Sequence, residues 1–192
     1  MPTVTAQSTW VRKTRKMIVC MSYAALCVAL AFLLPFITGN NRQLGNMLSL
    51  MHIPVFLCGL ICGPVWGGVV GFVSPLFRTL LVGMPPFPAV AVPMAFELLA
   101  YGIISGVFNR FVFKKLKYPI GLYLSLIVAM ILGRLVGGGV QFIMAGINNT
   151  TYSFGAMWTA YFATALPGIA LHIVVVPLLV MALRRAKLTI EE

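Results

Sequence analysis

The chain has 192 residues, of which 60% are hydrophobic and only 9% are charged, and its formal net charge is +11. Soluble domains carry about 25% charged residues, and disordered chains have low hydrophobicity, so this composition excludes both classes. It indicates a polytopic membrane protein, and at about 20 apolar residues per span the length allows roughly six transmembrane helices.

Six apolar segments follow one another along the chain, and each predicts a transmembrane helix. They are residues 17–37, 47–62, 65–82, 89–109, 119–146 and 154–183. The first follows a basic tail, 1–16, and we expect it to be retained because it has full span length and lacks a small-residue cleavage site. The prolines of 83–88 break the helical pattern. The predicted fold class is therefore all-α, a single six-helix membrane domain covering residues 1–192.

Basic residues gather at alternate ends of these spans. The tail 1–16 holds four Lys and Arg residues, the loop 110–118 holds four, and the tail 184–192 holds three, whereas the opposite loops hold only Arg42. Basic loops stay in the cytoplasm, so we expect both termini to be cytoplasmic. Because no soluble basic domain is predicted, the positive charge does not indicate a nucleic-acid partner.

Three charged side chains fall inside predicted spans, namely Arg78, Glu97 and Arg134. Each costs about 2.5–3.5 kcal/mol at mid-span on insertion scales, so such groups normally face the bundle interior. Glu97 is the only acidic residue outside the C-terminal tail. It either pairs with Arg78 or Arg134 and locks the helices, or lines a polar substrate pocket with them.

Several other polar and aromatic residues are predicted to lie at the same outer level of the membrane. Tyr101 shares a helix face with Glu97, and His52 lies close to the outer end of the second span. The remaining candidates are Gln141, Trp158 and Tyr161. Trp158 also suits an aromatic belt at the interface, and His172, deeper in the sixth span, is expected to be an interior hydrogen-bonded residue.

The sequence lacks the motifs of the common enzyme classes. It contains no G-x-x-x-x-G-K-[ST], no H-E-x-x-H and no G-x-S-x-G. We therefore expect no catalysis and no cofactor held by this chain. The four cysteines, Cys20, Cys27, Cys58 and Cys62, lie in apolar segments and are expected to be buried thiols rather than zinc ligands or disulfides.

Three stretches resemble the substrate-binding S components of energy-coupling factor (ECF) vitamin transporters. The first is Ala25-Leu26-Cys27-Val28-Ala29, which has small residues four positions apart. The others are MHIPVFLCGLICGPVWGGVVGFVSPLFRTLLVGMPP, 51–86, and MAFELLAYGIISG, 94–106. The resemblance extends over about residues 17–183.

This resemblance implies a function that composition does not give. It implies a multi-pass protein of the bacterial cell membrane that binds a vitamin from outside under a gating loop, here about 38–50, in which Asn46 is a candidate contact. The implied partners are a transmembrane coupling subunit, which docks at Ala25 and Ala29, and two cytosolic ATPases, which bind the ATP. The loaded subunit is implied to topple in the membrane.

The substrate remains open between two chemistries. Pantothenate, the first expectation, would place its carboxylate on Arg78 or Arg134 and its hydroxyl and amide groups near Glu97 or Tyr101. A vitamin B6 form, a pyrimidine precursor of thiamine or a queuosine precursor would instead use Glu97 as acceptor and stack on Trp158 or Tyr161. Two other classes also remain: a six-helix scaffold protein without ligand, and a channel or proton-coupled carrier.

Overall fold

The computed structural model describes residues 4–38, 48–112, 116, 118–148, 150 and 152–186, and it is helical throughout the regular elements of these ranges. Its elements are α1 (Val4–Leu33), η1 (Leu34–Thr38), α3 (His52–Cys62), α4 (Pro64–Val82), α5 (Ala91–Val107), η2 (Phe108–Val112), α6 (Tyr118–Ile147), α7 (Phe154–Trp158), η3 (Thr159–Ala163) and α8 (Leu166–Arg185). The segment η1 is a 3₁₀-helix, and η2 and η3 are π-helical turns.

Five helical segments in the described part of the chain are long and apolar enough to cross a membrane. They are Thr14–Phe36, Pro64–Val82, Ala91–Phe111, Pro119–Ile147 and Phe154–Arg185. These segments confirm the first and the third to sixth predicted spans. The side of the membrane on which the termini lie stays a prediction.

The second predicted span, 47–62, is shorter than expected. Its helix α3 has 11 residues, which is about 16 Å of helix against a hydrocarbon core of about 30 Å. Ser49 has a positive φ of 48°, a conformation that a right-handed helix cannot contain. At the other end Gly63 has a φ of 97°, and Pro64 begins α4. The helix α3 is therefore confined to part of the membrane depth.

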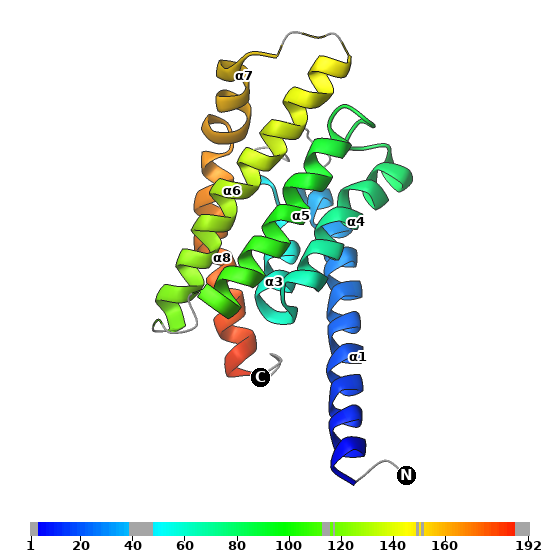
Figure 1. Ribbon diagram of the computed structural model, residues 1–192. Helices are drawn as coiled ribbons and strands as arrows, with labels where there is room; N and C mark the ends of the chain where they lie inside the picture. The colour runs from blue at the N-terminus through cyan, green and yellow to red at the C-terminus, as the bar shows by residue number, and fades with distance from the viewer. Residues whose placement is uncertain are drawn as a thin grey trace.

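The short helix α3 forms the centre of the bundle (Figure 1). It contacts α1, α4, α5 and α8, and every one of its residues except Ile61 is buried. Gly59 on α3, Gly67 on α4 and Gly102 on α5 let the three backbones meet, because a Cβ on Gly59 would come within 2.6 Å of the Gly102 carbonyl oxygen. Such small residues permit close helix approach in membranes.

The other helices surround this centre. The helix α5 packs between α4 and α6, and α6 also contacts α8. In Figure 1 the start of α1 and the end of α8 lie at the same end of the bundle, and α1 extends beyond its neighbours there. This arrangement agrees with the predicted even number of chain crossings.

The sixth predicted span is interrupted rather than continuous. Its first part is α7 followed by the π-helical turn η3, and α8 begins only at Leu166. Pro167 in the first turn of α8 has no backbone N–H. Thr164 and Ala165 form a turn between η3 and α8, and η3 contacts α6.

Candidate functional site

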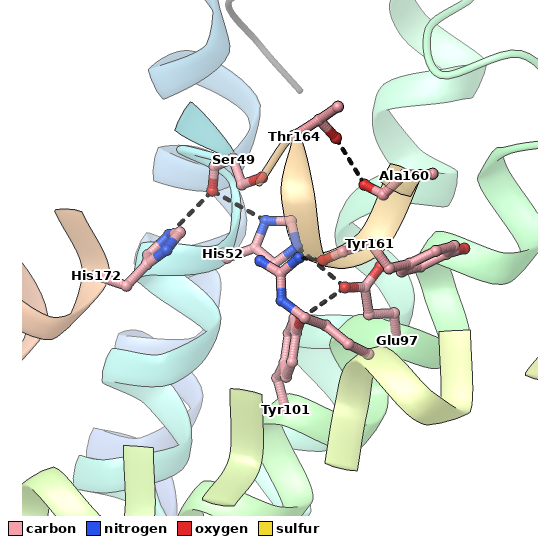
Figure 2. A network of polar contacts seen from close by, with 9 residues as sticks. Ser49, His52, Glu97, Tyr101, Ala160, Tyr161, Thr164 and His172 are labelled. Atoms are coloured by element: carbon pink, nitrogen blue, oxygen red, sulfur yellow. Dashed lines mark hydrogen bonds and ion pairs between the residues drawn. The ribbon is translucent and has the colours of Figure 1, made fainter. Parts of the chain in front are cut away.

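Glu97 and Tyr101 form the centre of a buried polar cluster. They lie one turn apart on α5, with exposed fractions of 7% and 1%. The Tyr101 hydroxyl donates to Glu97 Oε1 at 2.5 Å, a length typical of an O–H donor on a charged carboxylate. Figure 2 shows both side chains directed toward His52.

Two glycines of α6 make room for this pair. Gly133 faces the Tyr101 ring, and Gly137 faces the Cβ atom of Glu97 and the ring of Tyr161. A Cβ added at Gly137 would lie 2.8 Å from Glu97 Cβ, which is closer than side chains pack. The spacing of four residues places both glycines on one face of α6.

His52, the first residue of α3, bonds to Ser49 and lies near the Glu97 carboxylate. Its Nδ1 lies 2.9 Å from the Ser49 carbonyl oxygen, and since a carbonyl only accepts, Nδ1 is the donor. Its Nε2 lies 4.0 Å from Glu97 Oε1, which is beyond hydrogen-bond distance. The same Ser49 oxygen also accepts from His172 Nε2 on α8 at 3.2 Å (Figure 2).

Arg134 on α6 completes the cluster with a positive charge. Its exposed fraction is 4%, and its Nη1 donates to the backbone carbonyl of Tyr161 in η3. Its Nε is buried and has no hydrogen-bond partner in the described part of the chain. The guanidinium and the Glu97 carboxylate are both buried, and they form no direct ion pair among the described residues.

The polar cluster therefore brings together five predicted site residues from four helical segments, and sequence reasoning missed two others. The five are His52, Glu97, Tyr101, Arg134 and Tyr161, the last through its carbonyl. The missed residues are Ser49, which contributes only a backbone oxygen, and His172, which was expected to be hydrogen-bonded but not part of the site. A histidine inside an apolar span is itself a signal for such a network.

The other predicted site residues lie apart from this cluster. Arg78 on α4 places its guanidinium over the Phe36 ring, 5.9 Å from the centroid, so neither of the expected Glu97–arginine pairs is formed in the described part of the chain. Gln141 is half-buried. Trp158 is 54% exposed and stacks on Phe162 at 4.6 Å between centroids. Asn46 lies outside the described residues.

The remaining predicted features concern α1 and the cysteines. Ala25 and Ala29 lie on the exposed face of α1, opposite the buried Ala24 and Ala31. All four cysteines are buried and unbridged. Among the described residues no group of three or more His, Cys, Asp or Glu side chains is arranged to hold a metal ion.

Comparison with known proteins gives one extensive match. The family model described as "ECF transporter, substrate-specific component" matches residues 19–180. A Cronobacter sakazakii protein named for multidrug resistance, MdtD, is 30% identical over 106 residues, but this match covers 52% of the chain and the chain spans only 22% of that protein. No solved structure matches.

The family match covers most of the chain and includes every residue of the polar cluster. The partial likeness to the multidrug resistance protein does not extend to a whole protein and carries no conclusion about activity. Together with the five candidate spans, the family match shows that the chain belongs to the substrate-specific components of ECF transporters and is a multi-pass protein of the bacterial cell membrane.

Proposed function

We propose that the polar cluster binds a hydrophilic micronutrient and that the chain delivers it inward in a complex powered by partner ATPases. The observation that carries this proposal is the buried Arg134 guanidinium, whose Nε has no hydrogen-bond partner among the described residues. A buried unsatisfied donor costs about 1–3 kcal/mol, and more when it is charged. An acceptor on a bound substrate would remove that cost.

The cluster also suits a substrate because its polar groups come from separate elements. His52 on α3, Glu97 on α5 and Arg134 on α6 are held by different helices. Groups used only to join two helices would be satisfied by each other, whereas here Arg134 and Glu97 are not directly paired. Ionisable residues inside membranes are costly and usually functional, and family membership favours a ligand site over a scaffold role.

The proposed substrate is either pantothenate or one of the aromatic vitamins and precursors named above. Pantothenate has a carboxylate, an amide and two hydroxyls, and the B6, thiamine-pyrimidine and queuosine precursors have aromatic rings with polar edges. Pantothenate was expected to place its carboxylate on Arg78 or Arg134. Because Arg78 lies over Phe36, Arg134 is the arginine of the cluster that an anion could meet, and this weakens the case for pantothenate.

The proposed partners are a transmembrane coupling subunit and two ATPases, which bind the ATP. Ala25 and Ala29 are exposed on α1, where a second membrane protein can pack against them. We propose that α1 docks against the coupling subunit through Ala25 and Ala29. We also propose that the chain topples in the membrane with its ligand enclosed, because a polar molecule would cross the lipid unprotected only at a high free-energy cost.

Calorimetry on the purified protein tests the binding role. Candidate vitamins are titrated into the wild type and into Arg134→Gln, and native mass spectrometry searches for a retained small molecule. We expect binding without ATP and at least about a tenfold loss of affinity in Arg134→Gln, since a charged hydrogen bond of 1.5–3 kcal/mol is removed.

The matched control is Arg110→Gln, the same change at a half-buried arginine about 20 Å from Glu97 along the helix axis, which should leave affinity unchanged. A protein that binds nothing and retains nothing would contradict the binding role. Uptake in cells that persists without the ATPases and collapses with the proton gradient would replace it with a proton-coupled carrier.

A further inference from the structure

The hydrogen-bonding capacity left over in the polar cluster describes the substrate that fits it. Tyr101 occupies Glu97 Oε1, and Oε2 has no hydrogen bond within the described part of the chain. His52 Nδ1 donates to Ser49, so in the neutral ring Nε2 carries no proton and is an acceptor. The cluster therefore offers two acceptors, Glu97 Oε2 and His52 Nε2, beside one donor, Arg134 Nε.

The gap between His52 and Glu97 suits a donor from the substrate. His52 Nε2 lies 4.0 Å from Oε1 of the Glu97 carboxylate, too far for a hydrogen bond and too close for an intervening atom on the line between them. An N–H₂ group placed beside that line can donate one hydrogen to His52 Nε2 and the other to the Glu97 carboxylate at ordinary hydrogen-bond lengths of about 2.8 Å, whereas an O–H group donates to one of them. Arg134 Nε, unpartnered in the same cluster among the described residues, can donate to an acceptor on the same substrate.

The charges of the cluster are already balanced before a substrate enters. Glu97 and Arg134 are both buried in this cluster, and a nearby positive charge favours the ionised carboxylate, so their two formal charges cancel. A ligand carboxylate bound here would leave one net negative charge in a buried site, and a ligand ammonium one net positive charge. Uncompensated buried charge is strongly unfavourable.

We infer that the part of the substrate bound by His52, Glu97 and Arg134 is an uncharged edge with a hydrogen-bond donor next to an acceptor, such as an aminopyrimidine, an amide or a hydroxylated ring. This inference rests on the proposed binding function and narrows it. If pantothenate is the substrate, its hydroxyl and amide end enters the cluster and its carboxylate stays in contact with water, where it adds little affinity.

Matched pairs of probes test this inference on the full-length protein in detergent. Each pair shares a scaffold and differs in the presence of one anionic group: pantothenol and pantothenate, pyridoxine and its 5′-phosphate, and 4-amino-5-hydroxymethyl-2-methylpyrimidine and the corresponding 5-carboxylate. In whichever pair binds, the uncharged member should bind at least as tightly as the anion. An anion that binds about tenfold or more tighter overturns the inference and leaves the binding function intact.

Two variants test the charge balance through the ratio of anion affinity to neutral affinity, which a purely structural role of these residues would leave unchanged. Glu97→Gln leaves Arg134 uncompensated, so the ratio of anion affinity to neutral affinity should rise by about tenfold, whereas Arg134→Gln should lower it. The ratio should not change in Arg110→Gln. An unchanged ratio in a folded Glu97→Gln protein contradicts the charge-balance argument.

If either variant fails to fold, the wild-type comparison of the pairs still decides. A small molecule retained by the purified protein is judged by the same rule, through its own charged or uncharged analogue. If no probe binds and no molecule is retained, the proposed binding function fails, and the inference fails with it.

Discussion

At the scale of single residues, the donor and the acceptor of each hydrogen bond in the polar cluster are fixed by the chemistry of the groups. Ser49 contributes a carbonyl that only accepts, so both histidines must donate to it. Tyr101 must then satisfy one oxygen of the Glu97 carboxylate. The unused atoms of the cluster follow from these assignments, and they define where a substrate can bind.

Removing the Tyr101 hydroxyl tests this arrangement. In Tyr101→Phe the ring still packs against Gly133, but Glu97 loses a charge-assisted hydrogen bond of about 1.5–3 kcal/mol. We expect the free energy of unfolding in detergent to fall by about that amount, measured by thermal or denaturant unfolding. Tyr123→Phe, the same change at a half-buried position of α6, should have little effect. Equal stability in both variants would contradict the bond to Glu97.

At the scale of elements, glycines decide how closely the helices approach one another. The α6 glycines at 133 and 137 face α5, whereas Gly139 has no heavy atom within 4 Å of the position its Cβ would take. The same residue type therefore has a packing role at Gly133 and Gly137 and none at Gly139.

Alanine at these glycines should produce opposite results. Gly137→Ala places a methyl group 2.8 Å from Glu97 Cβ and 3.0 Å from Tyr161 Cε1, so we expect a loss of about 1–3 kcal/mol of stability from overpacking together with weaker ligand binding. Gly139→Ala should be neutral or stabilising by up to about 1 kcal/mol, because alanine favours helix. Thermal unfolding and calorimetry measure both quantities. Equal melting temperatures would contradict the close contact of α6 with α5.

The exposed face of α1 makes a separate prediction about assembly. Ala25→Trp or Ala29→Trp adds a large side chain to an exposed face, so we expect both variants to bind ligand normally but to fail to copurify with the coupling subunit. Leu80→Trp is the control, because Leu80 is 83% exposed on α4. Loss of ligand binding in the α1 variants would show that α1 contributes to the binding site, which contradicts the assigned polar cluster. Normal copurification with the coupling subunit would exclude this face of α1 as the docking surface.

At the scale of the whole molecule, the two ends of the bundle differ in charge. The start of α1 and the end of α8 lie at the same end of the bundle (Figure 1), and both carry basic clusters, with Arg184 and Arg185 in the last turn of α8. Because basic segments remain in the cytoplasm, we predict that this end is cytoplasmic and that the loop after α6 lies outside.

Cysteine labelling of intact cells tests this orientation. The four native cysteines are buried, so they should give little background. Asn148→Cys, in an exposed turn after α6, should react with a membrane-impermeant maleimide added to whole cells. Ala186→Cys should react only after the membrane is opened. The reverse pattern would invert the predicted topology.

The sequence by itself determined the membrane class, five of the spans and the residues whose burial is costly. Composition and apolar length set these features locally, and charge in an apolar span identified Glu97 and Arg134 without any tertiary information. The family resemblance, carried by local motifs, was likewise confirmed by the family match over 19–180.

Only the tertiary structure decided which of these residues meet. The backbone turn at Ser49 stops α3 short, and His52 and His172 share a carbonyl oxygen although His172 is 123 residues from Ser49. Arg78 and Arg134 are alike in sequence, yet one lies over Phe36 and the other in the polar cluster. Helix rotation and close packing at glycines separate them, because periodicity gives a side chain a helix face but not the neighbour that this face meets.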